Sequence, residues 1–236
     1  MHALALGPVV NLLASILWSF LLPDIGVFRV GVIDKRVSTL WSSLQESYDA
    51  CKTDKRLTTL TKGMLGTQYL PSLSCGAAQA KALITPMKHF VRKHYRAIAH
   101  DDHAIRCLEV LEDFYVPINE GGLFLSVEQS DRVLMAMEHF LLHYNWLSAW
   151  SRGRGEFLYN FVTKHHACWH LAHNARFLSP RATWCYAFED FIGHIKTCGF
   201  AQTPGTPMHV IPRKIMQNNI IILAILFGVP LGKGNG

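Results

Sequence analysis

Hydrophobic residues recur along most of the chain at intervals of three and four, the spacing that places them on one face of an α-helix. One such stripe follows Ser126 and Gln129, which match a capping box, and another follows Asp34, which we expect to cap its helix. The stripes are Val133, Leu134, Met137, Phe140, Leu141, Tyr144 and Leu147 in the first helix, and Val37, Leu40, Trp41, Leu44 and Tyr48 in the second. Strand-like alternation never persists for more than a few residues. The pattern predicts an all-α fold, an irregular bundle of about seven to eight helices.

Prolines predict where these helices bend or end. Pro86 should kink the helix that contains it, and the helix that begins at Asp101 should stop at Pro117. Residues 51–75 are polar and rich in glycine, which is typical of a solvated connection, with one short helix over residues 57–65.

The N-terminal run over residues 3–22 is almost wholly apolar and is long enough to cross a bilayer. It contains no Lys or Arg, and a glycine–proline pair should disrupt its first turns. Asn11, Ser15 and Ser19 recur every four residues and would form a weakly polar stripe on a helix. We therefore predict that residues 1–22 hold an apolar helix buried in a globular core. A membrane segment over residues 3–22 is the alternative.

Composition is that of a folded chain with a moderate positive charge. Of the 236 residues, 50% are hydrophobic and 17% charged, which argues against disorder. A chain of this length and composition can bury enough apolar surface to form one domain. We place that domain at residues 1–231, with residues 232–236 as a disordered tail. The six cysteines show no C-x-x-C pair, which favours a reducing compartment, so we expect an intracellular protein, nuclear or cytoplasmic.

The net charge of +6 is compatible with a nucleic-acid partner. Two groups of cations could contact phosphates: a cluster made of Lys88, Arg92, Lys93 and Arg96, and a loop that carries Arg152 and Arg154. The alternative for the cluster is a solvated face favoured by the helix dipole, and for the loop a flexible turn.

The stretch over residues 164–194 is dense in histidine, aromatic and acidic residues. His166 and His170 are four apart, so on a helix both imidazoles project from one face. They could hold a divalent metal with Glu189, take part in proton transfer, or lie partly buried and hydrogen-bonded to Glu189 or Asp190 as a link between helices. We favour the structural link. The glutamate of a zinc-protease H-E-x-x-H motif is replaced by Ala167, which excludes that class.

The same stretch carries a resemblance to a known family. Its pattern is Lys164-x-His166-x-x-x-His170-Leu171, then Pro180-Arg181-x-x-Trp184-x-Tyr186-x-x-Glu189-Asp190. It resembles the uncharacterised domain that follows the transposase domain in CACTA (En/Spm) mobile elements, over residues 70–227. A transposase needs three carboxylates holding two metal ions. If the family places its third acid in this motif, the resemblance implies Glu189 as that catalytic residue. The two partner aspartates would lie in a preceding RNase-H-like domain, for which this chain has no strand-rich region.

We therefore expect a helical module derived from a mobile element, without catalysis or a cofactor of its own, whose ancestral role was in DNA binding or transposase assembly. Its partners would be DNA or a transposase domain. Two alternatives remain open. One is a metal-dependent hydrolase or nuclease-like protein centred on His166, His170 and Glu189. The other is a protein anchored in a membrane through residues 3–22.

Overall fold

The computed structural model describes residues 4–183, which lie within one compact unit and contain seven α-helices and almost no strand. The α-helices are α2 (Val10–Leu21), α3 (Ile33–Ala50), α4 (Ala77–Ala82), α5 (Ile84–Lys93), α6 (Ala99–Glu120), α7 (Val127–Gly153) and α8 (Thr163–His173). A π-helical turn, η1 (Ala5–Val9), precedes them, and three 3₁₀ turns lie between or after them: η2 (Lys62–Leu65), η3 (Asn174–Arg176) and η4 (Pro180–Thr183). The all-α prediction is confirmed. The predicted limits of the domain and of its tail lie outside the described residues.

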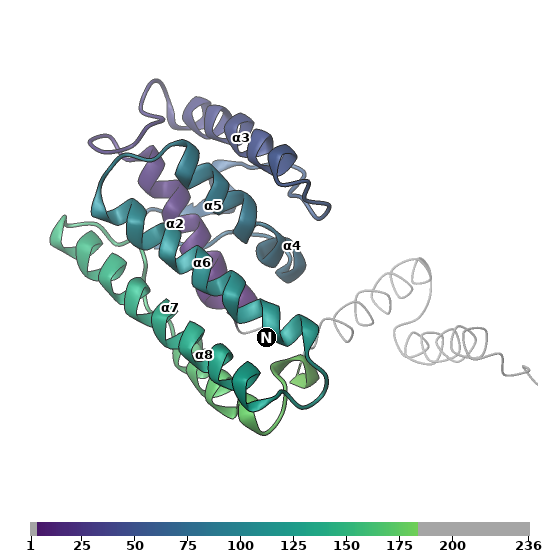
Figure 1. Ribbon diagram of the computed structural model, residues 1–236. Coiled ribbons are helices and arrows are strands. Elements are labelled where there is room, and N and C mark those ends of the chain that lie inside the picture. Colours follow the sequence, from purple (N-terminus) through teal and green to yellow (C-terminus); the bar gives the residue numbers. More distant parts are fainter. Residues whose placement is uncertain (1–3, 184–236) are drawn as a thin grey trace, which may run out of the picture. The chain divides into compact units, whose positions relative to one another are not determined.

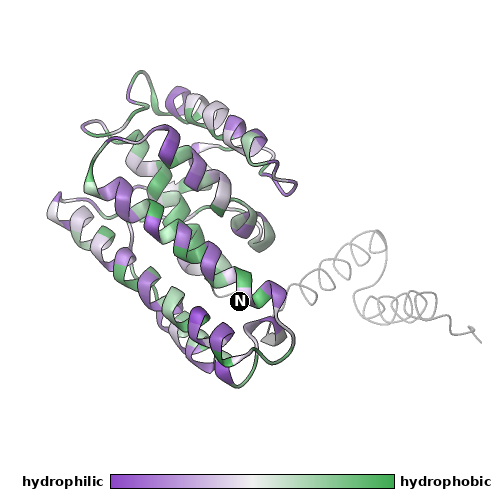
Figure 2. Ribbon diagram, viewed as in Figure 1, coloured by the Kyte–Doolittle hydropathy of each residue, from purple (hydrophilic) through white to green (hydrophobic). Residues whose placement is uncertain are grey.

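Helix α2 forms the centre of the core. All of its residues except Asn11 are buried, and a helix that is apolar on every side has to be enclosed. The segment after β2 lies along it, because the Leu73 amide donates to the Val10 carbonyl oxygen at 3.1 Å. Figure 1 shows α2 behind α5 and α6, and Figure 2 shows it coloured mostly as hydrophobic. The predicted buried helix is confirmed for residues 10–21.

Within residues 4–183, none of the helices combines the length and the apolar character that crossing a bilayer requires.

The chain enters α2 through the π-helical turn η1. Pro8 has no N–H and cannot donate to the Leu4 carbonyl, so the regular helical pattern cannot form there. Leu6 accordingly has non-helical backbone angles, with φ −99° and ψ 26°. The disruption predicted from Gly7 and Pro8 is confirmed.

At the C-terminal end of α2, the backbone that follows folds back and forms hydrogen bonds with the last carbonyl oxygens. The Gly26 amide donates to the Leu22 carbonyl oxygen at 2.9 Å, and the Phe28 amide donates to that of Phe20 at 3.0 Å. A Cβ atom at position 26 would lie 2.4 and 2.5 Å from these two oxygens. Only glycine therefore allows the chain to fold back this tightly over the helix end.

The two prolines inside helices act differently. Pro86 cannot donate to the Ala82 carbonyl, and α4 and α5 accordingly separate at Leu83, three residues before the proline. Pro117 does not stop α6, which continues to Glu120, so that prediction was wrong. Pro117 lies in the last turns, where the loss of one hydrogen bond is tolerated, and its ring is buried in the core.

Helix starts follow the sequence in part. Ser126 and Gln129 form the predicted capping box: Ser126 Oγ accepts from the Gln129 amide at 3.2 Å, and Gln129 Oε1 accepts from the Ser126 amide at 3.0 Å. Helix α3 begins at Ile33, with Val32 at the N-cap. Asp34 therefore lies in the first turn, where the helix dipole favours its charge, and does not cap the helix as predicted.

Residues 51–75 form the predicted connection, but the helix expected over residues 57–65 is only the 3₁₀ turn η2. Two short strands follow it, β1 (Gly66–Thr67) and β2 (Leu70–Pro71), paired antiparallel. Two-residue strands are too short to leave an alternation in the sequence.

The remaining helices pack around α2 in a simple order. Helix α7 lies along α6, α5 lies against α6 on its other side, α3 covers α5, and α8 packs on α7 (Figure 1). Side-chain hydrogen bonds join α3 to α5 and to the residue that caps it: Ser47 Oγ lies 3.1 Å from His89 Nδ1, and Ser43 Oγ lies 2.6 Å from Nε2 of the C-cap residue His94.

Helix α8 begins with a buried imidazole. His165 Nδ1 accepts from the Val162 amide at 3.0 Å, and its ring lies against those of Tyr144 and Phe161 with centroids 4.5 and 4.8 Å away. Its Nε2 is buried without a hydrogen-bond partner among the described residues. Burial lowers the pKa of His165 from 6.5 to about 4.

We predict that this histidine makes the fold less stable in mild acid. Between its unfolded pKa of 6.5 and its folded pKa of about 4, the unfolded chain binds more protons, so the free energy of unfolding falls as the pH falls. At about pH 5 the loss should be about 2 kcal/mol. His165→Gln keeps a side chain that can accept the Val162 amide but cannot titrate. Urea unfolding should therefore be measured at about pH 7.5 and about pH 5. The fall in the free energy of unfolding between these two pH values should be about 2 kcal/mol smaller in the variant than in wild type.

The matched control is Asn145→Gln, on an exposed position of α7 that carries no titratable group. It should leave the pH dependence of wild type unchanged. Equal pH dependence in wild type and His165→Gln would contradict the prediction.

Candidate functional site

The polar stripe predicted on α2 is present, and its two serines are bonded within the fold. Ser15 Oγ accepts from the Tyr159 amide at 3.0 Å. Ser19 Oγ donates to the Ile16 carbonyl at 2.7 Å and accepts from Arg96 Nη2 at 3.3 Å. Both serines are fully buried, so they need these partners. The third member, Asn11, is only half-buried and lines a pocket.

Arg96 lies at the centre of a buried polar network. Its Nη1 donates to the Ser19 carbonyl oxygen at the end of α2, at 2.9 Å. Its Nε lies 3.0 Å from Asp101 Oδ2, its Nη2 also contacts that carboxylate, and its own backbone amide donates to the same Oδ2 at 2.8 Å. The side chain is 10% exposed and that of Asp101 is 0% exposed. The several N–H groups of one guanidinium thus donate to a buried carboxylate and to a carbonyl at a helix C-terminus at the same time.

His100 continues the network to the segment after α7. Its Nδ1 lies 2.9 Å from Asp101 Oδ1 and 3.0 Å from Arg96 Nη2, and its Nε2 lies 2.6 Å from Tyr159 Oη. Tyr159 has a left-handed backbone, with φ +57°, although it is not glycine. Its buried hydrogen bonds hold it in this costly conformation.

The ionisation of these groups follows from their burial and their partners. Burial lowers the pKa of His100 and raises that of the Tyr159 hydroxyl well above its usual value. The pKa of Asp101 is lowered to about 2: burial opposes its charge, but hydrogen bonds from His100 and Arg96 and the guanidinium charge outweigh it. The network therefore holds one buried ion pair and a neutral imidazole at neutral pH.

The network resembles an acid–base relay in composition, but its His100, Asp101 and Tyr159 side chains are fully buried. Side chains enclosed in this way do not meet a dissolved substrate, so they support the fold. Arg96 was predicted to contact nucleic acid, but its guanidinium is bonded to Asp101 and to the Ser19 carbonyl of α2, which makes it a poor candidate for a phosphate contact.

The other cations of the predicted cluster form ion pairs on the surface. Lys88 pairs with Glu112, Arg92 pairs with Glu109 at 2.6 Å, and Lys93 pairs with Glu46. Each carboxylate offsets one positive charge. The structure therefore fits a solvated, charge-paired helix surface, which was the alternative interpretation of the cluster, better than a phosphate-binding face.

The arginine loop after α7 is anchored to the connection between α2 and α3. Arg154 forms ion pairs with Asp24 and, at 3.7 Å, with Glu156, and its guanidinium lies over the Trp150 ring. Arg152, predicted in this loop, lies instead in the last turn of α7, where it is exposed and donates to Ser148 Oγ at 2.8 Å. The loop is thus tied down, in contrast to the flexible turn considered from the sequence.

A basic pocket lies in the same connection, at the start of α3. It has a volume of about 230 Å³ and is lined by Arg29, Lys35 and Arg36, with no acidic residue among the described residues that line it. Arg36 Nε donates to the Phe28 carbonyl at 2.8 Å, whereas its Nη2 is buried without a partner among the described residues. Nothing in the sequence singled out these residues, because three cations spread over eight positions form no dense tract.

His166 and His170 share one face of α8, as their spacing predicts, and their Nε2 atoms are 2.9 Å apart. Both side chains are exposed, so the expectation that they are partly buried was wrong. Glu189 and Asp190 lie outside the described residues, and the predicted link and third metal ligand remain predictions. Among residues 4–183, no group of three His, Cys, Asp or Glu residues could hold a metal ion.

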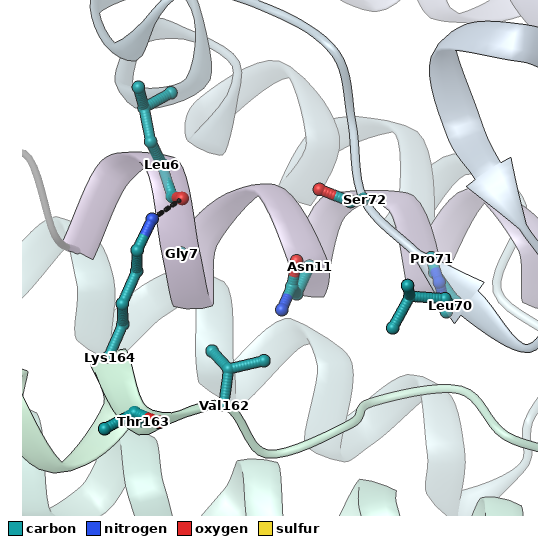
Figure 3. Close-up of a pocket in the computed structure, with 9 residues that line it drawn as sticks. All are labelled: Leu6, Gly7, Asn11, Leu70, Pro71, Ser72, Val162, Thr163 and Lys164. Atoms are coloured by element: carbon teal, nitrogen blue, oxygen red, sulfur yellow. Dashed lines mark hydrogen bonds between the residues drawn. The ribbon is translucent and has the colours of Figure 1, made fainter.

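A second pocket, of about 410 Å³, lies beside the π-helical turn η1 (Figure 3). Asn11 and Leu6 line it from the N-terminal helix, Leu70 from β2, and Val162 and Lys164 from the start of α8. It is the meeting point of three segments that are far apart in the sequence. Asn11 and Lys164 both belong to patterns seen in the sequence, but nothing in those patterns indicated that the two residues would line one pocket.

No family model, curated protein or solved structure matches this chain.

Proposed function

We propose that this chain is a helical module derived from a mobile-element protein, without catalysis of its own, that assists DNA binding beside a transposase domain. The order of motifs from Lys164 to Asp190 supports the origin. The observation that carries the DNA-binding role is the pocket lined by Arg29, Lys35 and Arg36, because its cations have no acidic residue beside them in the described lining.

The anchored arginine loop lies next to this pocket, and the charge of Arg154 is offset by its acidic partners. Arg29 donates to the Asp24 carbonyl at 3.3 Å, and Arg154 pairs with the Asp24 carboxylate, so both lie at the same connection. DNA phosphates attract such surfaces through charge and the release of counterions. Lys88 and Lys93 are weaker candidates, since each already pairs with a glutamate.

A salt series on two charge-matched variants tests this role. Fluorescence anisotropy of a labelled duplex is measured for wild type, Arg29→Gln/Lys35→Gln and Lys88→Gln/Lys93→Gln. Both variants lose two positive charges. We expect the first to weaken binding about tenfold at low salt and to reduce the slope of log affinity against log salt by about 2.

The second variant should bind nearly as wild type does. Absence of binding by wild type at low salt would contradict the DNA-binding role. Equal weakening in both variants would show an effect of net charge and would contradict the assigned surface.

Metal binding is a second candidate function, favoured by the His166–His170 pair. An Nε2–Nε2 distance of 2.9 Å lets two neutral imidazoles from one helix face ligate one ion. Cu²⁺ and Zn²⁺ suit such nitrogen ligands. Glu189 is the third ligand that the sequence predicts, and with it the site would be that of a metal-dependent hydrolase.

Calorimetric titration with Zn²⁺ should detect one site per chain that is lost in His166→Ala/His170→Ala. His139→Ala/His143→Ala removes a pair with the same spacing from α7 and should leave the site intact. Weaker binding in Glu189→Gln would support the third ligand. Loss of binding in both double variants, or no binding by wild type, would contradict the site.

A further inference from the structure

The pocket beside the π-helical turn is walled by apolar side chains and carries polar groups at defined places. Leu6, Leu70, Pro71 and Val162 supply the apolar surface, and Leu70 is 65% exposed. Figure 3 shows Lys164 rising beside Gly7 and the Asn11 side chain extending from α2 toward Val162. Pockets for small ligands combine such apolar walls with a few oriented polar groups.

Lys164 is held at the edge of this pocket. Its Nζ donates to the Leu6 carbonyl oxygen at 2.8 Å, at the residue whose backbone departs from the helix. Its carbon chain crosses Gly7 so closely that a Cβ there would lie 2.6 Å from Lys164 Cδ. An ammonium has three N–H donors, so the bond to Leu6 leaves others for a ligand.

Asn11 is the polar residue of the α2 stripe that the fold does not use. Ser15 and Ser19 are bonded to Tyr159 and Arg96, whereas the Asn11 amide has no hydrogen-bond partner among the described residues. No acidic residue occurs among the described residues that line the pocket. A positively charged donor and an amide therefore face an apolar space.

We infer that this pocket binds a small monocarboxylate with an apolar body. The carboxylate accepts hydrogen bonds from Lys164 Nζ and the Asn11 amide, and the body packs on Leu70, Pro71 and Val162. An anion is favoured over a cation because the described lining carries one positive charge and no negative charge. This inference is independent of the proposed DNA-binding surface, which lies at the start of α3.

The test is calorimetric titration of the full chain with 4-phenylbutyrate, compared with its neutral amide, 4-phenylbutanamide. We expect saturable binding of the acid at one site, and binding of the amide at least about tenfold weaker. Lys164→Met and Asn11→Leu each remove one polar group and should each weaken binding of the acid, Lys164→Met by about tenfold.

Lys62→Met removes an exposed charge from η2 and should leave binding unchanged. Circular dichroism establishes that each variant is folded, and the two pocket variants test the site separately. The inference is overturned if the acid does not saturate, if the amide binds equally well, or if both pocket variants bind the acid as wild type does.

Discussion

The fold depends on the contact between the Arg96 guanidinium, the Asp101 carboxylate and the C-terminal carbonyl of α2. The residues of the last turn of α2 are buried, so the carbonyl oxygens at this helix end need partners within the protein. Arg96 supplies the Ser19 carbonyl with a donor, and Asp101 supplies the guanidinium with a counter-charge. A buried charge that lacks its partner is strongly destabilising, so the three groups have to be buried together. His100, which precedes Asp101 in α6, connects this contact through Tyr159 to the loop after α7.

The interactions that hold this fold also decide which of its charges remain for a partner. Arg96 is inside, and Lys88, Arg92 and Lys93 are paired with acids on neighbouring helices. Two described pockets carry cations with no acidic residue in their described lining: Arg29, Lys35 and Arg36 at the start of α3, and Lys164 beside the π-helical turn. Lys35 and Lys164 lie in the first turns of α3 and α8, next to irregular segments of the kind where binding residues commonly lie. The exposed histidine pair on α8 is a third candidate binding place.

Local patterns predicted the helices well and the polar contacts poorly. The capping box at Ser126 and the stripe on α3 are set by residues within a few positions, and both are found in the structure. Asn11, Ser15 and Ser19 were visible as a stripe, but the partners of the two serines lie 144 and 77 positions away and leave no periodic signal. Arg96 was assigned to a basic surface because its contact with Ser19, 77 positions away, also leaves no local signal. The prediction that the helix ends at Pro117 was wrong because burial of the proline ring outweighed the loss of one backbone hydrogen bond.

The most direct test of this account is the free energy of unfolding of Arg96→Met, measured by urea denaturation beside Lys93→Met. Both substitutions remove one charge of an ion pair, but only Arg96 is buried. The account predicts a loss of about 3 to 5 kcal/mol, or failure to fold, for Arg96→Met. It predicts a loss below about 1 kcal/mol for Lys93→Met. Equal, small losses in the two variants would contradict it.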